Sequence, residues 1–316
     1  MRIGQAPGRA LLFGLTIAAI AASSTTAQPT LRAQLEQKFQ AELTRIADEA
    51  DGVVGIAAVD VTTGERFGVN EGLVFSQGSA IKIPILIELY RRADAGDLSL
   101  EERLPLRAAD RTGGSGLLQY FADGESELSL GDLAIPMIAL SDNTATNMLL
   151  DRLGMERITR TMADLGAPQT RVRRKMIRPE ESAKGNENVS TPREAAELMV
   201  RIARCELPVS ATSCSAIGRV LEIPKEGAFR DAIPPSIPVA WKPGGLEGVQ
   251  TAWGLVRLPG RPYAIAVMVN YGGPDMSGAI REASGAAYRH FSRIASTTEF
   301  GTRVPLGYVT KPVPPN

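Results

Sequence analysis

Histidine and cysteine are scarce in this chain of 316 residues, which has one histidine and two cysteines. Zinc hydrolases usually bind their metal through several His or Cys ligands, so this composition argues against them. A Ser-His-Asp triad would rest wholly on His290, which lies in a stretch of helical pattern over 284–294. A lone histidine on an amphipathic helix is more often a packing or surface residue. A hydrolase of this composition must move protons with another group, and we expect no metal or other cofactor.

The chain also lacks an excess of either charge, with 35 basic and 35 acidic residues. This balance favours neither nucleic acid nor an anionic membrane as a partner. The apolar run over 10–20 is shorter than the roughly 20 residues that a membrane span needs. It follows Arg2 and Arg9 and precedes small residues up to Ala27. We therefore predict a secretory signal peptide over 1–27 rather than a membrane anchor, export to the periplasm or medium, and no stable membrane insertion after cleavage.

The two cysteines, Cys205 and Cys214, lie in one short segment of this predicted exported chain. Exported proteins meet an oxidising environment, so we expect a disulfide across a helix-loop-helix. Two unpaired buried thiols are the alternative.

Apolar periodicity predicts a mixed α+β fold. A helix over 31–50 precedes a β-hairpin of 53–61 and 66–69, and a second strand pair covers 251–258 and 263–271. The remaining predicted helices lie between these β-rich ends, over 81–95, 130–140, 144–153, 155–165, 192–205 and 216–221. The mature chain, 28–316, exceeds the roughly 250 residues at which single cores tend to split. We expect an α/β lobe from about 28–75 and 235–300, a mainly helical lobe over about 76–234, and an active site in the groove between them.

Ser79 is the one serine with a lysine three residues later, in the run Ser79-Ala80-Ile81-Lys82. The following residues are apolar on nearly every side, so the helix that begins here should be buried. A lysine one turn from the serine, and desolvated there, loses its proton more readily and can act as general base toward the hydroxyl. The alternative is an N-cap serine beside an unrelated lysine.

Two further segments carry polar groups of interest. Ser141-Asp142-Asn143 precedes a predicted helix; it is either a capping cluster or a site in which Ser141 relays a proton and Asn143 holds a substrate amide. Trp241-Lys242-Pro243-Gly244-Gly245 precedes the strand over 251–258. It is either an ordinary turn or a place where Lys242 lies beside a substrate carboxylate while the backbone receives the substrate as an added strand.

The order Ser-x-x-Lys, Ser-Asp-Asn, Lys-x-Gly resembles that of class A β-lactamases and penicillin-binding proteins. The resemblance runs from about Gly52 to His290 and includes the segments 113–118 and 190–192. It implies a five-stranded antiparallel sheet flanked by helices, with a mainly helical lobe beside it. It also implies roles for the motif residues: Ser79 as acylated nucleophile, Lys82 as its base, Ser141 as proton relay, Asn143 as substrate contact and Lys242 as carboxylate-side cation. The backbone N–H groups of Ser79 and Gly245 would form the oxyanion hole. Gly244 and Gly245 would contact the substrate.

Two departures from the class A pattern concern the third motif and the Ω loop. Pro243 replaces the threonine whose hydroxyl would bind the substrate carboxylate. The segment 173–188 has no Glu-x-x-x-Asn pair to hold a deacylating water, and an ungapped alignment places Lys175 at the glutamate position. Glu180 and Glu181 are the candidates for a deacylation base, although a solvated acidic pair is the simpler interpretation.

We therefore expect a serine hydrolase of the β-lactamase type that acts through a Ser79 acyl-enzyme on a small-molecule substrate, a β-lactam or a peptide-like amide. One alternative is a DD-peptidase or penicillin-binding-like enzyme, or an esterase on the same scaffold. Another is a non-catalytic binding module with the same groove. A chromogenic cephalosporin separates these interpretations. Turnover indicates a β-lactamase, a stable mass adduct indicates acylation without release, and the absence of both indicates an esterase or a binding module.

The nucleophile assignment predicts that Ser79 alone is labelled by β-lactams or by a fluorophosphonate probe. Ser79→Ala should abolish labelling, because no other serine has a lysine one helical turn away. Intact-protein mass spectrometry measures the adduct. Labelling that survives the substitution would contradict the assignment.

Overall fold

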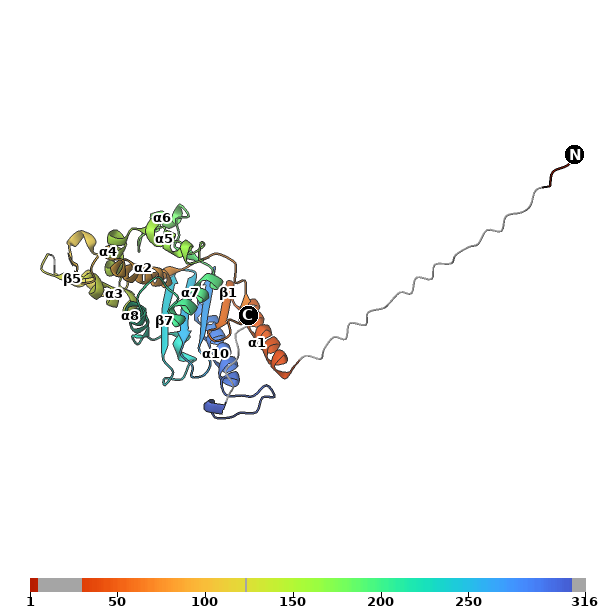
Figure 1. Ribbon diagram of the computed structural model, residues 1–316. Coiled ribbons are helices and arrows are strands. Elements are labelled where there is room, and N and C mark those ends of the chain that lie inside the picture. The colour runs from red at the N-terminus through yellow and green to blue at the C-terminus, as the bar shows by residue number, and fades with distance from the viewer. Residues whose placement is uncertain (5–29, 123, 309–316) are drawn as a thin grey trace.

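The computed structural model describes residues 1–4, 30–122 and 124–308 (Figure 1). Residues 5–29, which hold most of the predicted signal peptide, lie outside this range. One five-stranded antiparallel sheet has the order β2-β1-β9-β8-β7. Its strands are β1 (Val53–Asp60), β2 (Arg66–Val69), β7 (Val239–Leu246), β8 (Val249–Val256) and β9 (Tyr263–Asn270). The predicted α+β class and the sheet built from both chain ends are confirmed.

Helices cover both faces of this sheet. Helices α1 (Leu31–Glu49) and α10 (Met276–Ala295) pack together on one face, and α7 (Pro192–Arg204) packs on the other (Figure 1). Alternate residues of each strand point to opposite faces. In β1, Ile56 belongs to the apolar core with α1 and α10, whereas Ala57 belongs to the core with α7. Burial on both faces explains why the central strands are nearly continuous runs of apolar residues.

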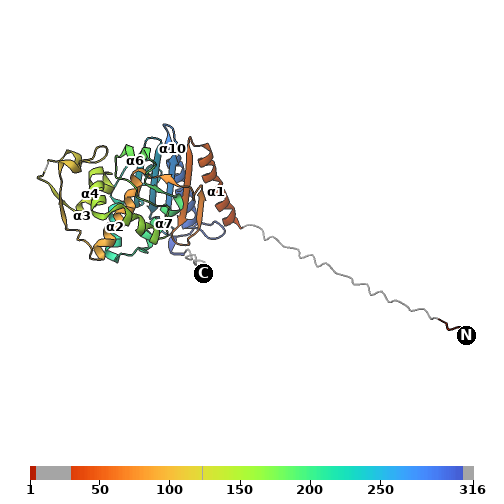
Figure 2. The same ribbon diagram turned by 90° about the horizontal axis from the view of Figure 1, so that it is seen from above.

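A group of helices extends from one side of the sheet (Figure 2). Its centre is α2 (Lys82–Asp94), surrounded by α3 (Leu130–Ala139), α4 (Asn143–Leu153), α5 (Met155–Asp164) and α8 (Ala211–Glu222). Ten residues of α2 are buried, including Lys82 and Glu88. The shorter elements are β3 (Phe75–Ser76), η1 (Gly78–Ile81), β4 (Arg103–Pro105), η2 (Ala108–Asp110), η3 (Leu118–Tyr120), β5 (Glu127–Ser129), α6 (Pro179–Ala183), β6 (Val189–Ser190), α9 (Ala228–Asp231) and η4 (Leu306–Tyr308).

Three features differ from the sequence-based expectation. The segment 241–245, which the sequence placed ahead of a strand, lies within the edge strand β7 itself. Its glycines and proline lower strand propensity, but pairing with β8 along its whole length overrides this. Helix α8 begins at Ala211, five residues before the predicted start, because Ser210 caps it through Ser213 N. Helix α7, expected in the helical lobe, packs against the sheet.

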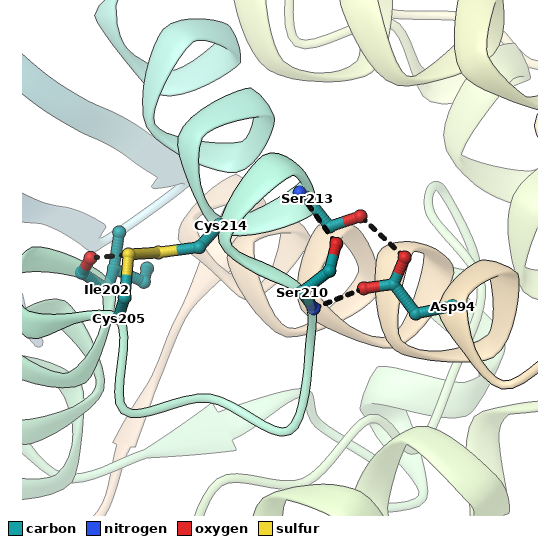
Figure 3. The surroundings of a disulfide bond; sticks show 6 residues. All are labelled: Asp94, Ile202, Cys205, Ser210, Ser213 and Cys214. Atoms are coloured by element: carbon teal, nitrogen blue, oxygen red, sulfur yellow. Dashed lines mark hydrogen bonds between the residues drawn. A yellow bond between two sulfur atoms is a disulfide. The ribbon is translucent and has the colours of Figure 1, made fainter.

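The predicted disulfide joins Cys205, which follows α7, to Cys214 in α8 (Figure 3). Asp94 at the end of α2 holds the same loop, because its carboxylate accepts from Ser210 N at 2.5 Å and from Ser213 Oγ at 2.8 Å. The turn between α7 and α8 is thus fixed covalently at one side and by hydrogen bonds to α2 at the other. In the described residues, no helix combines the length and apolar character of a membrane span.

Removal of the disulfide should destabilise the protein without changing its fold. The bridge spans a sequence separation of 9 residues, and closing so short a loop is worth about 2–3 kcal/mol in unfolding free energy. Denaturant unfolding of the double variant Cys205→Ala, Cys214→Ala measures the loss. Equal stability of variant and parent would show that the bridge contributes nothing.

Candidate active site

Ser79 and Lys82 lie where the turn η1 runs into α2. Ser79 is partly exposed inside η1, and Lys82 is the first residue of α2 with a fully buried side chain. Gln77 precedes η1 and Ile81 precedes α2 at the capping positions. The alternative of Ser79 as an N-cap is therefore wrong. No hydrogen bond of its hydroxyl is found within the described residues, and the side chain faces a cavity.

The ammonium group of Lys82 reaches the Ser-Asp-Asn segment. Its Nζ donates to Ser141 O at 2.7 Å, to Ser141 Oγ at 3.1 Å and to Asn143 Oδ1 at 3.1 Å. Burial lowers the pKa of Lys82 to about 7, although the nearby Asp142 carboxylate acts in the opposite direction. A lysine with this pKa is partly neutral near pH 7 and can accept a proton.

Ser141 Oγ lies between two buried lysines. Lys242 Nζ, from β7, donates to it at 3.1 Å and to Pro243 O at 2.8 Å. Burial, and then the neighbouring Lys82 and Lys225 cations, hold the pKa of Lys242 well below its usual range. Ser141 has a φ of 54°, a left-handed conformation that is costly for a residue with a Cβ. The two lysines and one hydroxyl therefore form a path along which protons can move.

The capping interpretation of the second motif holds for Asp142 alone. Its buried carboxylate caps α4 through Ala145 N at 2.9 Å and accepts from Leu117 N and Leu118 N at 2.6 and 2.9 Å. These bonds fix the segment 113–118 against the start of α4. Asn143 uses both ends of its amide, accepting from Lys82 and donating to Gly113 O at 3.0 Å.

Close packing between η1 and the edge strand β7 explains Gly244 of the third motif and Gly78 of the serine turn. A Cβ at Gly244 would lie 2.2 Å from Gln77 O and 2.7 Å from Ala80 N. A Cβ at Gly78, whose φ is +50°, would lie 2.7 Å from Gly245 N. Only glycine allows the two backbones to approach this closely. The backbones of Ser79 and Gly245 thereby border the same cavity.

That cavity has a volume of about 110 Å³. Segments far apart in the sequence line it, namely Gly78 and Ser79, Gly114 and Ser115, Asn143, the loop residues Arg174, Met176, Ile177 and Asn188, and Gly245 and Leu246. Of the residues expected from sequence, Ser79, Asn143 and Gly245 line the cavity. Lys82 is hydrogen-bonded to Asn143, and Ser141 and Lys242 are connected to Lys82 through Ser141 Oγ. Gly244 is not in the lining and packs against η1. Larger hollows elsewhere on the surface contain none of these residues.

The loop over 171–190 takes the place of the Ω loop and brings no acidic side chain to the cavity lining. Glu180 is exposed, and Glu181 accepts from Lys184 and Asn186 at 2.8 and 2.7 Å. Lys175 donates to Asp151 of α4 at 2.7 Å and is likewise absent from the lining. The structure therefore does not bring Glu180, Glu181 or Lys175 together with the motif residues.

Sequence reasoning did not single out Arg174 and Asn188. The buried Asn188 holds the loop, since Oδ1 accepts from Arg173 N and Arg174 N, at 2.7 and 3.1 Å, and Nδ2 donates to Arg174 O at 3.0 Å. Its position two residues before the Ser190-Thr191-Pro192 segment was the available signal. The side chain of Arg174 was not foreseeable, because adjacent Arg173, Arg174 and Lys175 look equivalent in the sequence.

His290 lies away from this site, stacked on Phe39 with ring centroids 4.3 Å apart. Its exposure is 2 %, and burial lowers its pKa to about 3. The histidine is therefore a neutral packing residue, in agreement with its interpretation from sequence.

The comparisons with known proteins agree on one family. The model of the family described as "Beta-lactamase enzyme family" matches residues 36–291. A β-lactamase from Rhodobacter capsulatus is 28% identical over 221 residues, which are 70% of this chain and 72% of that protein. The structure of a β-lactamase from Sphaerobacter thermophilus is similar with a TM-score of 0.73 and 32% identity, covering 81% of this chain and 97% of that one. The structure of PBP-A has a TM-score of 0.73 and 28% identity, with 82% and 96% covered.

The family match spans the sheet, whose strand β7 carries Lys242, and the helices, of which α2 carries Lys82. It therefore covers every segment that lines the cavity. The chain belongs to the β-lactamase enzyme family and is a serine hydrolase of the class A β-lactamase type.

Proposed function

We propose that this protein opens the amide of a β-lactam through an acyl-enzyme on Ser79, and that it releases the acyl group slowly. The observation that carries this proposal is that Lys82, three residues after Ser79, and Lys242 both donate to Ser141 Oγ. It supplies acylation chemistry without histidine. The family match favours this function over a peptidase, an esterase or a binding module.

In the proposed acylation step, neutral Lys82 accepts the proton of Ser79 as the hydroxyl oxygen attacks the lactam carbonyl. The N–H groups of Ser79 and Gly245 stabilise the developing oxyanion. The bond from the carbonyl carbon to the ring nitrogen then breaks, and Ser141 passes a proton to that nitrogen. Ser141 recovers a proton from Lys82, whose Nζ lies 3.1 Å from Ser141 Oγ.

Lys242 has two roles in this proposal. Its charge attracts the carboxylate of the substrate and favours the ionised state of Ser141 as the proton moves. Pro243 offers no hydroxyl at the next position, and Thr251 Oγ1, which lies beside Gly244, already donates to Gln77 O at 2.8 Å. Carboxylate binding therefore rests on Lys242 more than in the class A pattern.

Release of the acyl group needs a water activated by a base, and the cavity lining has no carboxylate in the part of the chain described. A variant of PBP-A was solved as an acyl-enzyme complex with penicillin G, which supports a stable ester on this kind of scaffold. We further propose that the protein acts after export, since the N-terminal pattern is that of a signal peptide.

One experiment tests the function. Purified protein is incubated with a chromogenic cephalosporin, and the intact protein is then weighed. We expect an adduct on the parent and none on Ser79→Ala. Absence of both turnover and an adduct would refute the proposal.

The rate of acylation should rise with pH and level off above about 7, the pKa of Lys82. Below this pH the lysine is protonated and cannot serve as base. Lys82→Met should lower the acylation rate by about 10²–10⁴-fold, the usual worth of general-base catalysis. Lys38→Met, at an exposed position of α1, is the matched control. Stopped-flow acylation between pH 5 and 9 measures the profile, and a profile flat through this range would contradict the assignment.

A penicillin should give a burst of about one equivalent followed by slow turnover. The reason is that a general base raises the rate of deacylation by roughly 10²–10⁴-fold, and the cavity lining supplies no carboxylate for this role. Glu180→Gln and Glu181→Gln should change the slow phase little, since neither side chain lines the cavity. Pre-steady-state absorbance measures both phases. A linear progress curve, or a loss of about 10²-fold in either variant, would show that the loop contains a dedicated base.

A further inference from the structure

Arg174 presents a cation to the cavity from the loop over 171–190. Its side chain is only 6% exposed, yet it lines the cavity together with Ser79, Asn143 and Gly245. Neither the family motifs nor the acylation chemistry above uses this arginine. A buried cation beside a reacting serine calls for an explanation.

The guanidinium is held in one orientation. Nε and Nη2 donate to Glu187 Oε2 at 3.2 and 2.9 Å, and Nη1 donates to Lys175 O at 3.1 Å. Asn188 fixes the backbone of the same residue. A guanidinium has five N–H groups, so these three bonds leave one N–H on each of Nη1 and Nη2. Two parallel donors of this kind match a carboxylate.

The charge of Arg174 is not balanced from within the cavity. Glu187, its partner, is absent from the cavity lining, and the described residues place no other acidic side chain there. Because the acidic partner is absent from the lining, an anion in the cavity would meet Arg174 without a competing carboxylate. The adjoining Met176 and Ile177 give this wall an apolar part, and Asn188 completes the loop's share of the lining.

The wall that holds Arg174 is separate from the strand that holds Lys242. In the proposed function, Lys242 and β7 receive the carboxylate next to the lactam nitrogen, so the loop faces the acyl side chain at the other end of the substrate. We propose that Arg174 is a specificity-determining residue that binds a carboxylate on the acyl side chain, with Met176 and Ile177 contacting its apolar part. This inference rests on the proposed function.

A matched pair of penicillins tests the inference. Benzylpenicillin and α-carboxybenzylpenicillin differ by one carboxylate on the side chain. The measured quantity is the ratio of their second-order acylation rate constants, carboxylated over neutral. Arg174→Gln should lower this ratio by about tenfold, the low end of what a hydrogen bond to a charged group is worth. Arg174→Lys keeps the positive charge but loses the two parallel N–H donors of the guanidinium, so it should give an intermediate ratio.

Glu187→Gln distinguishes recognition from loop stability. Both Arg174→Gln and Glu187→Gln break the same ion pair, so a structural role changes the ratio in the same direction or leaves it unchanged. Direct recognition predicts opposite changes, because loss of Glu187 leaves the Arg174 charge uncompensated and should raise the ratio severalfold. Thermal melts establish whether each variant is folded. If the glutamine variants are unfolded, the ratio measured for Arg174→Lys tests the inference instead.

The failures are distinguishable. Changes in the same direction, or equal losses with both penicillins, would overturn the role of Arg174 while leaving the proposed function intact. Absence of acylation of the parent by either penicillin would overturn the proposed function itself.

Discussion

Two lysines share one hydroxyl in the interior of this protein, and the site depends on that arrangement. Lys82 and Lys242 are fully buried, and each donates to Ser141 Oγ at 3.1 Å. Two ammonium charges this close and this dry repel each other and lose hydration, so burial favours the neutral form of at least one. Desolvation of a charge destabilises an ordinary core, but here it lowers the pKa of Lys82 to about 7, so that the side chain can accept a proton near neutral pH. The carboxylate of Asp142, next to Ser141 in the chain, opposes this lowering of the pKa.

Gln77 connects the parts of the fold that must stay in register. Its buried side chain accepts from Trp253 Nε1 at 2.8 Å, and its backbone N–H donates to Asn188 O at 2.9 Å. Its carbonyl accepts from Thr251 Oγ1 at 2.8 Å. The sheet, the serine turn and the loop over 171–190 thus meet at one residue two positions before Ser79. A shift of any one of them would move the nucleophile relative to its cavity.

The loop over 171–190 is one of two departures of this chain from the class A pattern, the other being Pro243 in the third motif. Arg174 lines the cavity, while Lys175 turns outward to Asp151. The loop contributes Arg174, Met176, Ile177 and Asn188 to the cavity lining, and none of them is a carboxylate that could activate water. In the function proposed above, the strand β7 and the serine turn would form the ester, and the loop would select the acyl group and set how long it remains.

The sequence by itself identified the candidate site residues and determined the outline of the fold. Ser79 with Lys82, Ser141 with Asn143, and Lys242 were found from local spacing, and the sheet strands and main helices from apolar periodicity, because both signals depend on neighbours along the chain. Tertiary structure alone decided the rest. Pairing with β8 made 239–246 a strand, and packing against the sheet placed α7 there. The choice of Arg174 over Lys175 at the cavity depends on Asn188 and Glu187, more than ten residues away, and no local pattern records such contacts.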